Sequence, residues 1–406
     1  MRFLHVADLH IGKRVHERPM LDEQEHAFDQ LISIAEDQRV DAVLVAGDVF
    51  DRPNPSSVAL ELSERFLASF VRRNIPVFVV PGNHDSAQQV AYCSTITDAA
   101  GLHVARPYRG HIATFSLEDA DGPVCVHLLP FVRPLDVRAA FPQREAEIKT
   151  HHDAVRVALE EHPLEQGVRH VLVAHQFVTA MGIDPERCES ETMSSLGGLD
   201  NVDASLFDAF DYVALGHLHG PQRVGRNAVR YAGSPVRYSF SEISQKKAAC
   251  IVDLDGQGNV TVTQIPLMPL HAMREITCSL EDLEAGKDTG DHQDYMHVTL
   301  TDRSAYDAFN RVKAVYPHLL LLSWQEAEIA ASSGKMTLSE MKQKSCFELF
   351  SDFFMEQTGQ GLTDEQCTIV QDIMRDDQAG RTGQTGAWGV LDEKSSKQTS
   401  GQGERS

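Results

Sequence analysis

Short apolar runs, several of them followed at once by Asp, Asn, Gly or His, recur through the first 240 residues, and they constrain the fold more than any other feature. The runs lie at 3–7, 42–46, 76–80, 124–129, 170–174 and 212–215. Between them, apolar residues recur with helical spacing, as in Phe28, Leu31, Ile32 and Ala35. A second, less regular stripe consists of Leu60, Phe66, Leu67, Phe70 and Val71. Buried strands separated by helices predict a layered α/β domain.

The spacing of the predicted strands and helices changes along the rest of the chain. Between 229 and 265 the strands follow one another closely, as in a closing sheet, and 272–325 alternates strand, helix, strand, helix, strand. Two helices are expected within 336–376, from capping boxes at Thr337–Glu340 and Thr363–Gln366. The tail is too polar to order itself. We therefore predict domains at 1–268 and 269–330, a helical segment at 336–376 and a disordered tail at 377–406.

Composition and charge limit the class of protein. Hydrophobic residues make up 42% and charged residues 24% of 406, which is typical of a soluble globular protein. No apolar run approaches the ~20 residues that span a bilayer, and the first ten residues lack the apolar core of a signal peptide. We expect a cytoplasmic protein. The seven cysteines are scattered without a CxxC, which argues against a disulfide framework or a cysteine zinc site.

A net charge of −22 argues, taken alone, against a nucleic-acid partner. The window 201–250 departs from this balance, since it holds six basic residues and four acidic ones. A polyanionic substrate is therefore permitted by the sequence, although the charge pattern does not identify one.

Polar side chains cluster directly after five of the apolar runs. In an α/β fold the carboxyl ends of the strands share one edge, where ligands bind, so these clusters should converge. The candidate metal ligands in them are Asp8, His10, Asp48, Asn83, His175, His217 and His219. His84 and Asp85 accompany them in the sequence GNHD.

Two carboxylates, one amide and four imidazoles exceed the four ligands of a single structural zinc and fit two metal ions. In an extended segment Asp8 and His10 would point the same way and reach one ion. The same holds for His217 and His219 unless the turn splays them, in which case each serves a different metal. Mixed nitrogen and oxygen ligands favour Mn, Fe, Zn or Co over Mg.

The order of these clusters resembles that of the calcineurin-like metallophosphoesterase superfamily, and in particular its branch of double-strand-break repair nucleases. The resemblance covers 1–265 most strongly. It rests on HVADLHIGK (5–13), AGDVFDRPNPS (46–56), VPGNHDS (80–86), ALGHLHGPQ (214–222) and AGSPVRYSFSE (232–242). It implies an α/β four-layered sandwich, with two mixed sheets flanked by helices, a small α+β capping domain and a C-terminal helical arm.

The resemblance also implies residue roles. Asp8, His10 and His219 would bind the first metal, Asp48 would bridge, and a second set would bind the other metal: Asn83, His175 and His217. Catalytic His84 would face the scissile phosphate instead of binding metal, and Asp85 is a weaker candidate to orient it. The cofactor implied is a pair of divalent ions, with Mn²⁺ expected and Mg²⁺, Fe²⁺ or Co²⁺ as alternatives.

The function implied is that of a DNA nuclease, with 3′→5′ exonuclease activity on double strands and endonuclease activity on single strands and hairpins. The implied partners are a coiled-coil ABC ATPase, which the 336–376 helices would contact, a second copy of this subunit within a heterotetramer, double-stranded and hairpin DNA, and no membrane. Two alternatives stay open: a small-molecule phosphoesterase with the same metal core, and a non-catalytic scaffold with structural metals. The extra 272–325 unit argues against the first, and His84 argues against the second.

Overall fold

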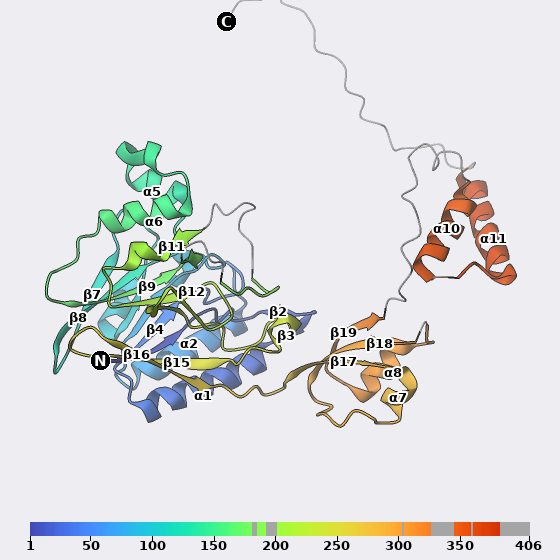
Figure 1. Ribbon diagram of the computed structural model, residues 1–406, viewed down its shortest axis with the longest axis horizontal. Helices are drawn as coiled ribbons and strands as arrows, with labels where there is room; N and C mark the ends of the chain where they lie inside the picture. Colours follow the sequence, from blue (N-terminus) through green and yellow to red (C-terminus); the bar gives the residue numbers. More distant parts are fainter. Residues whose placement is uncertain (181–184, 192–200, 303, 326–344, 359, 382–406) are drawn as a thin grey trace, which may run out of the picture. The chain divides into compact units, whose positions relative to one another are not determined.

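The computed structural model describes residues 1–180, 185–191, 201–302, 304–325, 345–358 and 360–381 (Figure 1). It divides into two compact units, Met1–Ser323 and Trp324–Ser406. The finer domain boundaries expected from the sequence stay predictions. The capping box expected at Thr337–Glu340 lies outside the described residues. The tail predicted to be disordered from 377 was placed too early, because 377–381 continue a helix, and the rest of it lies outside the described residues.

Two six-stranded mixed sheets form the centre of the first unit. The first sheet has the order β16 (Val260–Pro266), β15 (Ala248–Leu254), β1 (Arg2–Val6), β4 (Ala42–Ala46), β5 (Val77–Val80), β6 (Leu102–Val104). The second has the order β13 (Gln222–Val224), β14 (Arg226–Tyr231), β12 (Tyr212–Gly216), β9 (Arg169–His175), β8 (Gly122–Leu129), β7 (Ala113–Asp119). All six strands predicted from the apolar runs are confirmed.

In the first sheet, the neighbours β1, β4, β5 and β6 run parallel, and β15 and β16 pair antiparallel. In the second sheet, β8, β9, β12 and β14 run parallel, and the outer strands β7 and β13 pair antiparallel. The first unit also contains two short strand pairs: β2 (Arg14–Val15) with β3 (Arg18–Pro19), and β10 (Val178–Thr179) with β11 (Val202–Asp203). The parallel strands therefore bring several carboxyl ends to one edge of each sheet.

The strands alternate their side chains between two cores, because successive residues of a strand face opposite sides of its sheet. From β1, Phe3 packs between the two sheets, against residues of the second sheet such as Val171 and Tyr212. Leu4 packs on the other face, in the core that also holds Phe28 and Phe66 from the helices. The second sheet has a comparable outer core with its own helices. The expected four-layered α/β sandwich is thus confirmed.

Helices cover the outer faces of both sheets. They are α1 (Leu21–Gln38) and α2 (Ser57–Val71), the short α3 (Ala87–Val90) and α4 (Ser94–Thr97), and α5 (Pro134–Ala140) with α6 (His151–Glu160). In α2, Phe66 and Phe70 are buried as the stripe predicted, but Leu60 is 50% exposed, so its place in the buried stripe was wrong. No helix in the described part of the chain is long and apolar enough to cross a membrane.

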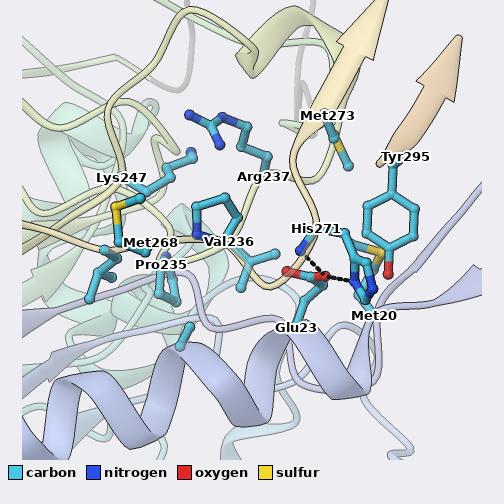
Figure 2. A pocket seen from close by; sticks show the side chains of 13 residues that line it. Met20, Glu23, Pro235, Val236, Arg237, Lys247, Met268, His271, Met273 and Tyr295 are labelled. Atoms are coloured by element: carbon cyan, nitrogen blue, oxygen red, sulfur yellow. Dashed lines mark hydrogen bonds and ion pairs between the residues drawn. The ribbon is translucent and has the colours of Figure 1, made fainter. Parts of the chain in front are cut away.

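The predicted strand–helix alternation at 272–325 is confirmed. Its elements are β17 (Met273–Cys278), α7 (Leu280–Glu284), β18 (Tyr295–Leu300), α8 (Ala308–Val315) and β19 (Leu319–Trp324). The buried carboxylate of Glu23, on α1, accepts the backbone N–H groups of Leu270 and His271 at 3.1 and 3.0 Å. It also lies 2.7 Å from His271 Nδ1, beside a pocket lined by Met20, Met273 and Tyr295 (Figure 2). Glu23 thereby holds the segment that leads into β17.

The described part of the second unit consists of two helices, α10 (Cys346–Thr358) and α11 (Asp364–Arg381). The capping box predicted at the start of α11 is confirmed, since the Thr363 and Gln366 side chains and backbone N–H groups bond reciprocally. A capping box that we did not predict, between Ser345 and Glu348, begins α10.

Candidate metal centre

The predicted ligands converge where five strands end. β1, β4 and β5 of the first sheet lead into three of the polar clusters, and β9 and β12 of the second sheet lead into the other two. Within the described residues, three overlapping groups have ligand atoms within 4.8 Å of one another: Asp8–His10–His219, His10–Asp48–His84 and Asp8–Asp48–His175. The two sheets therefore contribute to a single centre.

The first predicted set, Asp8, His10 and His219, is gathered as expected. The Nε2 atoms of His10 and His219 face each other at 3.1 Å. The Asp8 carboxylate accepts the backbone N–H of His217 at 2.9 Å, which ties the end of β1 to the end of β12. All three side chains are buried.

The second predicted set also meets, around the amide of Asn83. Its Oδ1 lies 2.9 Å from His175 Nε2 and 2.9 Å from His217 Nδ1. His217 and His219 therefore face different partners, so the turn splays them, as one of our two alternatives allowed. The His175 ring is fixed from behind, because its Nδ1 donates to the carbonyl oxygen of Ala46 at 2.9 Å.

Asp48 lies between the two sets. Its Oδ2 is 3.6 Å from His10 Nε2 and 3.4 Å from His175 Nε2. Its Oδ1 accepts the backbone N–H of His84 at 2.9 Å, which leaves Oδ2 facing the two rings. This is the position that a bridging carboxylate requires.

The backbone is bent sharply at the centre. Asp8, His10, Asp48 and His217 have φ angles of 52°, 43°, 49° and 112°. Our argument that Asp8 and His10 share an extended segment was therefore wrong. They lie beyond the end of β1, on a turn fixed by backbone bonds from Asp8 and His10 to the segment after β4.

Two glycines lie where a side chain of the candidate ligand set comes close to the backbone. A Cβ on Gly82 would lie 2.2 Å from Asp48 Oδ1, and a Cβ on Gly47 would lie 2.2 Å from His175 Nδ1. Any side chain at these positions would push Asp48 or His175 out of place, so both positions require glycine.

Burial and mutual charge shift the ionisation of the cluster. Burial raises the pKa of Asp8 well above its ordinary value, and the nearby Asp48 carboxylate raises it further. Burial opposes ionisation of Asp48, yet the imidazoles of His175 and His10 hold its pKa well below the usual range. Conversely, Asp48 outweighs burial at His175 and raises the pKa of that ring to about 9. Burial lowers the pKa of His217 to about 3, so its ring is neutral at pH 7.

These residues fit divalent metal ions. Buried imidazole nitrogens face one another with carboxylates at their side, and His10 Nδ1 is buried without a hydrogen-bond partner among the described residues. The carboxylates of Asp8 and Asp48 are buried close together, so they need positive charge beside them. Mixed imidazole, carboxylate and amide donors of this kind suit first-row divalent ions.

His84 and Asp85 occupy different environments. His84 is partly exposed, and its Nδ1 lies 3.2 Å from the carbonyl oxygen of Asp51. Asp85 does not orient His84, so that expectation was wrong. Its carboxylate instead accepts the backbone N–H groups of Gly82, Val49 and Phe50 at 2.9–3.0 Å, because adjacent side chains diverge. Asp85 therefore joins the loops after β4 and β5.

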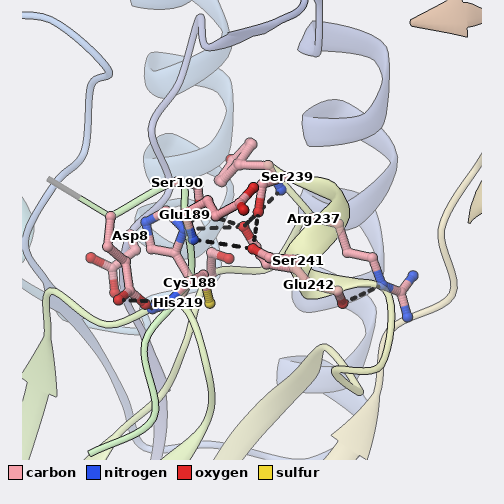
Figure 3. A network of polar contacts seen from close by, with 12 residues as sticks. Asp8, Cys188, Glu189, Ser190, His219, Arg237, Ser239, Ser241 and Glu242 are labelled. Atoms are coloured by element: carbon pink, nitrogen blue, oxygen red, sulfur yellow. Dashed lines mark hydrogen bonds and ion pairs between the residues drawn. The ribbon is translucent and has the colours of Figure 1, made fainter. Parts of the chain in front are cut away.

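Sequence reasoning missed a second group of polar residues around His219 (Figure 3). The His219 backbone N–H donates to Glu191 at 2.7 Å, and its Nδ1 lies 2.8 Å from Ser190 Oγ. Ser190 in turn donates to Glu242 at 2.5 Å, and Glu242 pairs with Lys247. The sequence signal for this group was Glu242, because it falls within 232–242, one of the stretches on which the resemblance rests.

Comparison with known proteins places this centre in a family. The calcineurin-like phosphoesterase model matches residues 1–221, which include every predicted ligand. The chain belongs to the calcineurin-like phosphoesterase family. A second model, the type 5 capsule protein repressor C-terminal domain (SbcD_C), matches residues 269–358.

Curated relatives agree with these matches. The SbcD subunit of nuclease SbcCD from Staphylococcus saprophyticus is 28% identical over 384 residues, covering 92% of this chain and 98% of the relative. The protein of the same name from Staphylococcus epidermidis is 27% identical with the same coverage. These relatives and the family matches confirm the resemblance inferred from the motifs. Among solved structures, a dimetal phosphatase from Danio rerio has 11% identity and a TM-score of 0.37, covering 66% of this chain and 97% of its own.

Asp48→Ala should release at least one metal ion per chain. A bridging carboxylate holds two cations together, and without it their mutual repulsion is no longer offset. Metal content of the purified variant, measured by mass spectrometry, checks this, with His84→Ala as the matched control that should keep both ions. Two tightly bound ions in Asp48→Ala would remove the bridging role.

Proposed function

We propose that this chain is a two-metal DNA phosphodiesterase, the nuclease subunit of an SbcCD-type complex. It would act as an ATP-dependent 3′→5′ exonuclease on double strands and as an endonuclease on single strands and hairpins. The observation that carries the proposal is the meeting of seven candidate ligands at the strand ends of a calcineurin-like phosphoesterase. The relatives named as the SbcD subunit of nuclease SbcCD, which match nearly the whole chain, support DNA as the substrate.

In this proposal Asp8, His10 and His219 hold one metal ion, and a second set holds the other, with Asp48 between them. The second set consists of Asn83, His175 and His217. Two divalent ions, Mn²⁺ in our proposal, supply a water nucleophile at neutral pH and offset charge on the phosphate. The chain's part is to hold its imidazoles and carboxylates in fixed orientations, which the burial and hydrogen bonds described above support.

His84 is the proposed catalytic residue. Its backbone N–H is fixed by Asp48 at 2.9 Å, while its side chain is partly exposed beside the buried ligands. Its ring centroid lies 4.9 Å from that of His10. A group at this position can approach a bound phosphodiester and give a proton to the leaving 3′-oxygen.

His84→Ala should lower the rate of DNA hydrolysis about 10²–10⁴-fold, the usual loss when a general acid is removed. The measurement is cleavage of linear and hairpin DNA with Mn²⁺, with and without the ATPase partner and ATP. His111→Ala, an exposed histidine, is the control. Hydrolysis of a simple diester such as bis(p-nitrophenyl) phosphate without any cleavage of DNA would favour the small-molecule alternative.

We also propose a homodimer formed through α2 and the α3–α4 segment. Leu60 on α2 is 50% exposed, and Tyr92 and Ile96 are 79% and 72% exposed. Leu60 and Tyr92 line an apolar groove together with Leu67, Val90 and Leu102. An apolar surface of this kind is typical of a protein–protein interface, and a second copy presents the same surface.

Leu60→Glu combined with Ile96→Glu should convert the dimer to a monomer, because a buried interface would have to accept unpaired charges. Size-exclusion chromatography with light scattering gives the mass. Leu135→Glu is the control, since Leu135 is 65% exposed on α5, away from this groove. An unchanged mass for the double variant would contradict the assigned surface.

The helices α10 and α11 are the proposed contact with an SbcC-type coiled-coil ABC ATPase. Phe347, Phe350 and Phe354 follow helical spacing along α10, and Phe350 and Phe353 remain 36% and 57% exposed. On α11, Ile369 and Ile373 are also exposed. The stripe is thus incompletely covered by the neighbouring helix, which supports a partner site over simple packing within the pair.

Deleting 336–376 should leave the nuclease activity of the isolated subunit largely intact and abolish co-purification with the ATPase. The metal centre lies in the first compact unit, which ends at Ser323. Pull-down and ATP-stimulated cleavage are the measurements, and Phe353→Ala serves as a milder variant. Unchanged affinity of the deletion variant for the ATPase would contradict the assignment.

A further inference from the structure

The imidazole of His219 is engaged at both nitrogens. Its Nε2 faces His10 Nε2 at 3.1 Å, on the side of the proposed metal ion. Its Nδ1 points to Ser190 Oγ at 2.8 Å and to Glu242 Oε1 at 3.4 Å. A ligand histidine can present a lone pair at Nε2 only when its proton sits at Nδ1, and the group that accepts this proton sets the tautomer.

The acceptor at the end of this path is Glu242. Ser190 accepts from His219 and donates to Glu242 Oε1 at 2.5 Å, so the three side chains form one directed chain (Figure 3). Glu242 Oε1 also accepts the backbone N–H of Tyr238 at 3.2 Å, and Ser239 Oγ lies 3.3 Å away. The carboxylate is fully buried and bonded on several sides, so its position is fixed.

Lys247 completes the arrangement. Its ammonium lies 2.5 Å from Glu242 Oε2, and the residue is 4% exposed. The same nitrogen donates to the carbonyl oxygen of His219 at 2.9 Å and to Ser234 Oγ at 2.8 Å. The ion pair therefore holds His219 twice, at its ring through Glu242 and at its backbone through Lys247.

A buried ion pair is poor evidence for stability alone, because desolvation of both charges offsets their attraction. An apolar pair of similar volume would stabilise the fold about as well. Both charges here contact the same candidate ligand, which points to a role in the metal centre.

We propose that Glu242 is a positioning residue for the first metal site: through Ser190 it fixes the tautomer and orientation of His219. This inference deepens the proposed function, since it rests on the assignment of His219 as a metal ligand. It also predicts an asymmetry. His175, in the second set, is braced by the carbonyl oxygen of Ala46, so loss of Glu242 should weaken one of two metal sites.

Mn²⁺ titration of the metal-free, full-length protein by calorimetry tests the proposal. Glu242→Gln keeps the size of the side chain and removes its charge. The double variant Glu242→Gln/Lys247→Met avoids an unpaired buried ammonium, and Ser190→Ala breaks the path without touching the ion pair. Glu23→Gln is the matched control, because Glu23 is also a buried carboxylate bonded to a histidine, His271, outside the metal centre.

We expect the three test variants to weaken one Mn²⁺ site by about 10–100-fold and to leave the other unchanged. Electron paramagnetic resonance at two equivalents of Mn²⁺ should then show a coupled pair in wild type and in Glu23→Gln, and isolated Mn²⁺ in the test variants. Wild-type binding of both ions by the folded double variant would overturn the proposal. Equal weakening of both sites, shared by Glu23→Gln, would overturn it too.

The outcome is separable from that of the proposed function. A wild-type protein that binds two Mn²⁺ but cleaves no DNA would overturn the nuclease assignment, while the variant titrations would still decide the role of Glu242. A wild-type chain that binds fewer than two Mn²⁺ would overturn both.

Discussion

Two buried carboxylates that face the same space impose the main constraint on this structure. Asp8 and Asp48 are almost fully buried and belong to one group with ligand atoms within 4.8 Å. At an effective dielectric constant of about 20, like charges at that distance repel by roughly 3–4 kcal/mol. Burial raises the pKa of Asp8 most, the His175 imidazole opposes that shift, and the Asp48 carboxylate adds to it. Divalent ions bound between these carboxylates would offset the same repulsion, which is the physical reason for the proposed cofactor.

The sheets supply the rigidity that such a centre needs. Four of the ten non-glycine residues with positive φ in the described chain are candidate ligands, and each such conformation costs about 1–3 kcal/mol. Strain of this size persists only on a well-packed scaffold. The strands that lead into the centre are buried on both faces, with one core between the sheets and another beneath each helical layer. The Asp85 carboxylate accepts backbone N–H groups from the loops after β4 and β5, so it holds these two turns together.

Sequence patterns predicted the strands and the edge at which they end, because both follow from the order of apolar and polar residues along the chain. Apolar runs identified the strands, and because parallel strands end at one edge, the convergence of Asp8, Asp48 and His175 followed. The patterns did not predict the conformation of the turns after the strands. Asp8 and His10 were therefore placed on an extended segment, and Asp85 was expected to orient His84. Ser190, Glu242 and Lys247 were missed for another reason. They lie apart from His219 in the sequence, and only the fold brings Ser190 and Glu242 to its ring and Lys247 to its carbonyl oxygen.

The distribution of positive charge bears on how an acidic chain could grip DNA. The window 201–250 is locally basic, yet three of its six basic side chains bond to the protein's own carbonyl or carboxylate oxygens. Arg226 donates to the carbonyl oxygens of Phe207 and Phe210, Arg237 to those of Glu242 and Gln245, and Lys247 is buried against Glu242. Phosphate binding needs cations that are available to displace counterions.

These groups therefore add little to DNA affinity, and the net charge of −22 works against it. A nuclease of this composition gains more from a partner that holds the DNA than from its own surface. The first unit carries the candidate metal centre, and the second carries the exposed aromatic stripe of α10. On this argument, the net charge of −22 favours the proposed dependence on an ATPase partner as well as resemblance does, because a partner with a positive surface would offset that charge.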